Sequence, residues 1–217
     1  MNPLIETLPP AQRLALAYAP ARLREVTLGL LALDLHLAAL VRGTREPILG
    51  QVRLAWWRDR LGEPVADRPK GDPLLALLAG WEGHEAGLTA LIDGWEHMLG
   101  ADLDAAAIDA FAKGRATGFG TLASLAGKPD ASGVAVIAGH RWALADLAAH
   151  LGKTQEKARA LEAAAGLGSH AVALPRALRP LAVLDGLACR SLANGGAPLA
   201  EGPRAALVAL RLGIVGR

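Results

Sequence analysis

The sequence contains one cysteine, Cys189, and few aromatic side chains. A lone cysteine excludes an internal disulfide and a thiolate-rich metal site, so a reducing compartment is expected. Aromatic residues make up 4% of the chain and β-branched residues are sparse, which excludes a β-sandwich and most α/β sheets. Every stretch of about 18 residues contains a charge, so no membrane span is expected. The stretch nearest to one, residues 28–41, is interrupted by Asp34 and His36.

The sequence also lacks the common signatures of nucleic-acid binding, secretion and catalysis. Its formal net charge is only +2 and no block of Lys or Arg occurs, so no nucleic-acid partner is expected. The first residues, MNPLIETLPPAQR, do not resemble a signal peptide, which favours a cytoplasmic protein. No CxxC, HExxH, G-x-S-x-G or P-loop motif is present, and no catalytic residue is assigned. The glycine-rich string GRATGFG, residues 114–120, lies inside a helical pattern, which favours close helix packing over a phosphate cradle.

Two helix-forming residue types dominate what is present, with 46 Ala and 40 Leu among 217 residues. Hydrophobic residues make up 52% of the chain, enough apolar surface to exclude disorder. Proline and glycine residues separate each helical pattern from the next. No segment between them is long enough to be a linker between two domains. The sequence therefore predicts one all-α domain over residues 1–217.

Local start signals place several helix boundaries. Pro47 occupies the first position of a helix, Asp72 caps another before Pro73, and Asp102 or Asp104 caps a third. Thr154 is expected to cap a later helix. The predicted helices cover residues 10–18, 22–42, 47–63, a short segment from 73, 85–99, 103–125, 134–151, 154–167, 174–192, which Pro180 must bend or interrupt, and 204–212.

Polar residues inside apolar helices are the candidate site residues. Asp34 and His36 interrupt a Leu/Ala run on different sides of one helix, and each either lines a cavity or pairs with a neighbour. The cluster around Arg53, Trp56 and Trp57 is either a Trp-anchored core helix with ion pairs at its rim or a pocket for an anion with an apolar tail.

A metal site has one weak candidate in the sequence. Asp146 and His150 stand four residues apart on one helix, which is half of a metal site or a hydrogen bond at the helix surface. No cofactor is expected from the residues alone.

Several segments, in order, resemble the squalene/phytoene synthase family. The most specific is EPILGQVRLAWWRDRLGE, residues 46–63, preceded by RLALAYAPARLREVTLGLLALDLHLAALV. The segments DPLLALLAGWEGHEAGLTALIDGWEHML, FAKGRATGFGTLASLAG and VALPRALRPLAVLDGLACRSL follow in the family's order, so the resemblance covers about residues 10–195. It implies an isoprenoid-synthase-like bundle of helices around a central cavity.

The enzymes of this family join two prenyl diphosphates head to head, using carboxylates that hold Mg²⁺ against the departing diphosphate. Here the first aspartate pair of the enzymes falls on Ala38 and Ala39, and a later member of that motif on Arg42. The second motif retains only Asp146, with His150 four residues on. The chain is most similar to the branch without these aspartates, whose mitochondrial members assist assembly of respiratory complex I.

Three functional hypotheses are open, the first two of which follow from this resemblance. The first is a non-catalytic protein that binds an isoprenoid or lipid, or a partner protein, with Arg53 and Trp57 at the mouth of the cavity. The second is an active Mg²⁺-dependent prenyl transferase with a rearranged site made of Asp34, Asp146 and Asp93. The third is a helical interaction module without a ligand. Peripheral membrane association is compatible with the first, because prenyl substrates and respiratory complexes are both membrane-bound.

Overall fold

Helices follow one another along the whole described chain. A computed structural model describes residues 2–100 and 102–216, and within these ranges the protein is all-α, without a β-strand. The helices are α1 Leu4–Thr7, α2 Pro10–Ala17, α3 Ala21–Arg42, α4 Pro47–Gly62, α5 Pro73–Leu78, α6 Glu85–Glu96, α7 Ala105–Leu125, α8 Ser132–His150, α9 Thr154–Ala165, α10 Arg179–Ala193 and α11 Pro203–Ile214. Short 3₁₀ turns occupy Val65–Asp67, Ala79–Trp81, His97–Leu99, Pro129–Ala131 and Arg176–Leu178.

The predicted start signals act where the sequence placed them, with two exceptions. Pro47 begins α4, and Asp72 caps α5 by accepting hydrogen bonds from the backbone N–H groups of residues 74 and 75. Asp104 caps α7. The prediction that Thr154 caps a helix was wrong, because Thr154 is the first residue of α9 and no side chain caps that helix. The prediction of a helix over residues 174–192 was wrong only at its start: α10 begins at Arg179 with Pro180 in its first turn, so residues 174–178 lie outside the helix, and the predicted interruption at Pro180 is confirmed.

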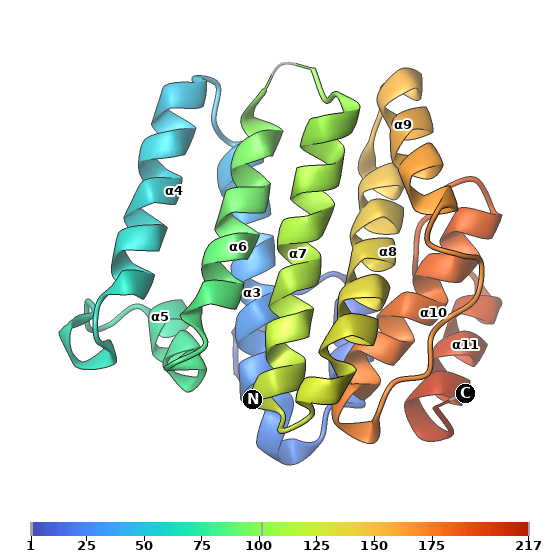
Figure 1. Ribbon diagram of the computed structural model, residues 1–217, viewed down its shortest axis with the longest axis horizontal. Coiled ribbons are helices and arrows are strands. Elements are labelled where there is room, and N and C mark those ends of the chain that lie inside the picture. Colours follow the sequence, from blue (N-terminus) through green and yellow to red (C-terminus); the bar gives the residue numbers. More distant parts are fainter. Residues whose placement is uncertain (1, 101, 217) are drawn as a thin grey trace.

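The long helices lie side by side (Figure 1). The central helix α7 packs against α6 on one side and α8 on the other, and α3 runs behind them. The helices α4 and α5 lie at one end of this row, and α9, α10 and α11 lie at the other. The core between them is built mainly of Leu and Ala, with the large rings of Trp81, Phe111, Phe119 and Trp142 fully buried.

Glycines let the backbones of α6 and α7 touch. A Cβ atom on Gly114 would lie 2.5 Å from the carbonyl oxygen of Ala90 and 2.8 Å from Cα of Gly94. A Cβ on Gly118 would lie 2.8 Å from Cδ1 of Leu30 in α3. The string GRATGFG lies within α7, so the prediction that it serves close helix packing is confirmed. This close crossing brings the middle of α7, and with it Arg115, into the interior.

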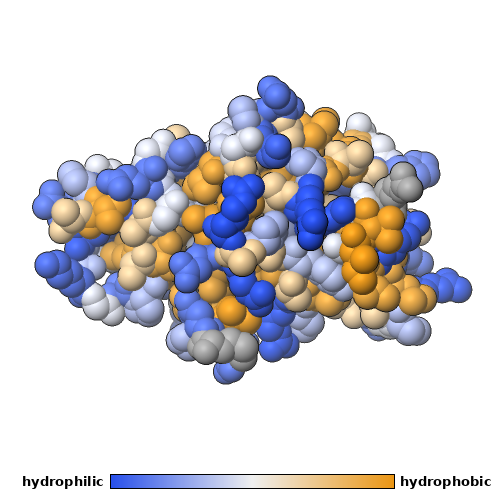
Figure 2. All heavy atoms as spheres, turned by 90° about the horizontal axis from the view of Figure 1, so that it is seen from below, coloured by the Kyte–Doolittle hydropathy of each residue, from blue (hydrophilic) through white to orange (hydrophobic). Residues whose placement is uncertain are grey.

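Two helices at opposite ends of the row carry apolar side chains on their outer faces. On α4, Ile48 and Val52 are 72% and 62% exposed, while Leu54 and Trp57 on the opposite face are buried. On α11, Leu207 and Ile214 are 64% and 65% exposed. Figure 2 shows apolar side chains gathered at the end of the molecule where α11 lies.

Among the described helices, none combines the length and the hydrophobicity that a membrane-spanning segment requires.

Candidate functional site

A cavity of about 520 Å³ opens between α2, α3, α7, α8 and the turn after α6. Its volume is within the range of about 300–1,000 Å³ that is typical of small-molecule sites. The side chains that line it are mostly apolar: Pro9, Leu35, Ala38, Val41, Trp95, Met98, Phe111, Leu147 and Leu151. The polar ones are Gln12, Asp34, Arg42, Arg115, Asp146 and His150.

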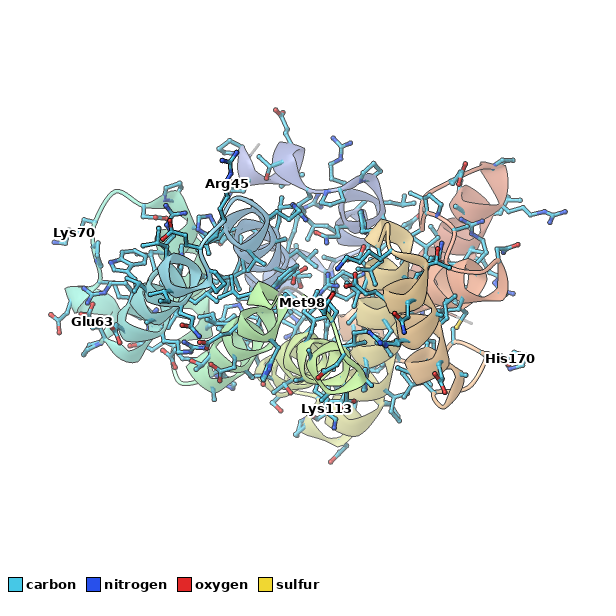
Figure 3. The ribbon with its side chains drawn as sticks, turned by 90° about the horizontal axis from the view of Figure 1, so that it is seen from above. Arg45, Glu63, Lys70, Met98, Lys113 and His170 are labelled. Carbon is cyan, nitrogen blue, oxygen red and sulfur yellow. The ribbon has the colours of Figure 1, made fainter. Side chains whose placement is uncertain are left out.

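The two ends of the cavity differ in exposure. Arg42 and His150 lie at the C-terminal ends of α3 and α8 and are exposed, so they mark its mouth. Figure 3 looks onto this end of the bundle and places Met98 between the surrounding helices. Asp34 and Arg115 are buried in the middle of their helices and mark its inner end.

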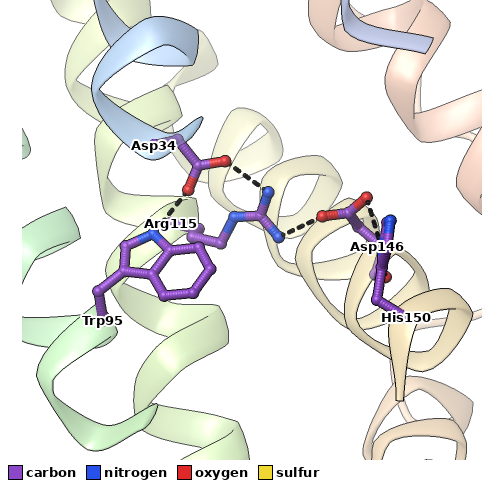
Figure 4. A network of polar contacts seen from close by, with 5 residues as sticks. All are labelled: Asp34, Trp95, Arg115, Asp146 and His150. Atoms are coloured by element: carbon purple, nitrogen blue, oxygen red, sulfur yellow. Dashed lines mark hydrogen bonds and ion pairs between the residues drawn. The ribbon is translucent and has the colours of Figure 1, made fainter. Parts of the chain in front are cut away.

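At the inner end, Arg115 lies between two aspartates that come from different helices (Figure 4). Its Nη2 donates to Asp34 Oδ2 of α3 at 2.6 Å, and its Nη1 donates to Asp146 Oδ2 of α8 at 3.0 Å. The second oxygen of Asp34 accepts a hydrogen bond of 2.8 Å from the indole N–H of Trp95. The network therefore joins α3, α6, α7 and α8 at one buried point.

Aromatic rings surround the guanidinium. The Arg115 Cζ atom lies 3.9 Å from the ring centroid of Trp142 and 5.2 Å from that of Phe111. Burial by itself disfavours the charged guanidinium, but the two carboxylates outweigh burial and raise the pKa of Arg115 above its ordinary value. Arg115 is therefore a permanent cation inside the protein.

At Asp34, unlike at Arg115, burial outweighs the charged partner. It raises the pKa of this carboxyl group, and the hydrogen bonds from Arg115 and Trp95 oppose the rise. With one guanidinium between two aspartates, the inner end of the cavity has no surplus positive charge.

The carboxylates that face this cavity do not fit a divalent cation. Both oxygens of Asp34 and one oxygen of Asp146 already accept hydrogen bonds, and Arg115 stands between the two residues. Asp93 instead accepts a hydrogen bond of 2.5 Å from Arg58 and is exposed. Within residues 2–100 and 102–216, no three His, Cys, Asp or Glu side chains group closely enough to hold a metal ion.

Three of the predicted site residues meet at this cavity. Asp34, Asp146 and His150 all line it, and His150 Nδ1 lies 2.7 Å from the backbone oxygen of Asp146, one helical turn away. The distance from that nitrogen to the nearer Asp146 carboxylate oxygen is 3.7 Å. The pair thus makes a local contact at the end of α8.

The other predicted residues lie elsewhere. His36 and Trp57 line a second cavity of about 340 Å³ beside Asp72, with their ring centroids 4.9 Å apart. Arg53 is exposed and Trp56 is 41% exposed, and neither belongs to the described residues that line these two cavities. Trp56 therefore lies on the outward flank of α4 and not in a pocket.

Sequence reasoning missed Arg115, Trp95 and Gln12. The signal for Arg115 was present, because a basic residue stands among Gly, Ala and Phe in the string FAKGRATGFG of an apolar helix. Such a residue needs a buried counter-charge, and the two partners lie 81 and 31 positions away.

A second buried ion pair anchors the chain between α9 and α10. Arg141 of α8 donates to Asp185 Oδ1 of α10 at 3.0 Å and to the backbone oxygens of Leu167 and His170. Asp185 Oδ2 accepts a 2.9 Å hydrogen bond from the N–H of Val172. The pair therefore holds the irregular segment 166–175 against the core.

The stability contributed by Asp185 should depend on pH. Burial raises its pKa to about 6, above the ordinary 3.8, so the folded protein holds this proton more tightly than the unfolded chain. Stability from this group is present at low pH and is lost as pH rises through about 4 to 6. At 1.36 kcal/mol per pKa unit, the loss is about 3 kcal/mol.

Urea unfolding of wild type and Asp185→Asn at several pH values tests this expectation. The free energy of unfolding of wild type, minus that of the variant, should fall by about 2.4 kcal/mol between pH of about 4 and about 7, most of the full loss. The subtraction removes the contributions of His36 and His140, whose pKa values burial lowers in both proteins. A difference that stays constant, or that rises with pH, would contradict the expectation.

Scans against protein-family models, curated proteins and solved structures each returned no match. The resemblance to squalene/phytoene synthases therefore stays a prediction from the sequence.

Proposed function

We propose that this chain is a non-catalytic squalene/phytoene-synthase-like protein whose central cavity binds an isoprenoid or similar lipid chain without a metal ion. The observation that carries the proposal is a largely apolar cavity of about 520 Å³ whose two aspartates are bridged by Arg115. An apolar cavity favours an apolar chain, and a fixed guanidinium between the carboxylates takes the place that a divalent cation would need.

The positions named by the family resemblance support this assignment. Ala38 and Arg42, where the resemblance places carboxylates of the enzymes, both line the cavity. Asp146, the remaining member of the second motif, lines it from the opposite side on α8. A methyl group and a guanidinium cannot hold Mg²⁺, so the same cavity is left without the ligands that prenyl transfer requires.

The active-transferase alternative needs Asp34, Asp146 and Asp93 to act together. The hydrogen bonds of Asp34 and Asp146 to Arg115, and that of Asp93 to Arg58, count against it. A module without any ligand would need a filled core, and the size of the cavity counts against that alternative.

An assembly or partner-binding role is the second candidate. The exposed apolar flank of α4, formed by Ile48, Leu49, Val52 and Trp56, favours it because large apolar side chains in contact with water are typical of binding surfaces. Peripheral membrane association stays part of this candidate, since α11 has exposed Leu207 and Ile214 beside Arg204 and Arg211.

Calorimetric titration with a non-hydrolysable farnesyl diphosphate analogue and with farnesol, each with and without Mg²⁺, tests the proposed function. We expect binding of the prenyl chain whose affinity is unchanged by Mg²⁺. Affinity that rises tenfold or more with Mg²⁺, about 1.4 kcal/mol, would favour the transferase. If neither compound binds, lipid binding is wrong and the search should turn to a protein partner.

A further inference from the structure

The charges around the cavity restrict the head group of its ligand. At the inner end, Arg115 is already paired with Asp34 and Asp146 at 2.6 and 3.0 Å. Arg42, the other cation in the lining, is exposed at the mouth. A diphosphate at the inner end would face two carboxylates and no free cation, which like-charge repulsion disfavours in a buried site.

Two buried polar atoms of the lining residues have no hydrogen-bond partner in the described part of the chain, Nε of Arg115 and Oε1 of Gln12. Gln12 lies on the buried face of α2, is 4% exposed and lines the cavity. Its Oε1 atom has no hydrogen-bond partner in the described part of the chain. A buried polar group without a partner is costly, so a ligand that supplies one would be favoured.

The chemistry of an amide identifies what that partner is. The Gln12 side chain offers a carbonyl acceptor and N–H donors, and rotation about its last torsion turns either toward the cavity. A hydroxyl group both donates and accepts, so it pairs with the amide in either orientation. It also brings no charge to a cavity whose buried cation, Arg115, is already paired with two carboxylates.

We propose that the cavity takes a prenyl chain that ends in an uncharged hydroxyl group, with the hydroxyl hydrogen-bonded to Gln12. The chain lies against the apolar side chains of Leu35, Val41, Met98, Phe111 and Leu147, which line the same cavity. This assignment rests on the proposed function, which is that the cavity binds a prenyl chain. It adds the chemical class of the ligand's head group.

Dissociation constants of farnesol, farnesene and farnesyl diphosphate for the full-length protein test the assignment. Intrinsic tryptophan fluorescence provides the readout, because Trp95 lines the cavity. Wild type should bind farnesol about three- to tenfold more tightly than farnesene, the gain expected from one hydrogen bond. Farnesyl diphosphate should bind more weakly than farnesol, with or without Mg²⁺.

Gln12→Leu should remove the preference for farnesol over farnesene, and the matched variant Gln155→Leu, at an exposed position of α9, should keep it. Tighter binding of the diphosphate than of farnesol would overturn the hydroxyl assignment while prenyl binding stands. Equal binding of farnesol and farnesene by wild type would also overturn the hydroxyl assignment. This measurement does not require the Gln12→Leu variant to fold. If none of the three compounds binds, the proposed function itself is wrong.

Discussion

Arg115→Met is expected to lower the free energy of unfolding by about 3–5 kcal/mol, the usual cost of removing one partner of a buried ion pair. The methionine keeps an unbranched apolar side chain against the ring of Trp142, which the guanidinium contacts at 3.9 Å from Cζ to the centroid. The charge is lost, and Asp34 is left buried opposite Asp146 with no cation between them. Urea unfolding at neutral pH measures the loss.

Repeating the substitution in a protein without the two carboxylates separates the effect of the lost charge from the effect of the changed packing. In Asp34→Asn/Asp146→Asn protein, replacing Arg115 with Met should cost less than half as much, because no carboxylate is left without a counter-charge. Lys113→Met, two residues away on the exposed face of α7, should change stability by at most about 0.5 kcal/mol. If Arg115→Met costs no more than Lys113→Met does, the buried network contributes nothing to stability.

Helices and most of their starts could be predicted because their signals are local. A proline at the first position of α4 and an aspartate before α5 act on backbone groups within three residues. The start of α10 was misplaced because Leu174 continues the apolar pattern, yet the segment before Arg179 is held by Arg141 of α8. That tertiary contact leaves no trace in the local sequence.

The site was harder to predict than the helices, and α4 shows why. Helical spacing correctly placed Trp56 with Ile48 and Val52 on one flank and Trp57 away from them, but it could not say which flank faces the core. Both flanks of α4 are apolar, so the usual rule of an apolar inner face decides nothing. Asp34, by contrast, was a sound candidate because a lone carboxylate in an apolar run needs a buried partner.

Ala38→Phe should abolish most of the affinity for a prenyl chain and leave the fold intact. Ala38 is 6% exposed and lines the cavity from α3, so the new ring would enter existing space rather than packed core. If the ring displaces about 100 Å² of ligand contact, the loss is about 2.5 kcal/mol at 25 cal/mol per Å². That corresponds to an increase in the dissociation constant of about fifty- to a hundredfold.

The adjacent position provides the matched control. Ala39 is exposed and lines the second cavity with His36 and Trp57, so Ala39→Phe adds the same ring on the other side of the same helix. Farnesol titration of both variants, with urea unfolding to show that each remains folded, compares the two cavities directly. Loss of affinity in Ala38→Phe alone places the ligand beside Arg115. Loss in Ala39→Phe alone would move the ligand to the His36 cavity, and the argument from the buried arginine would then fail.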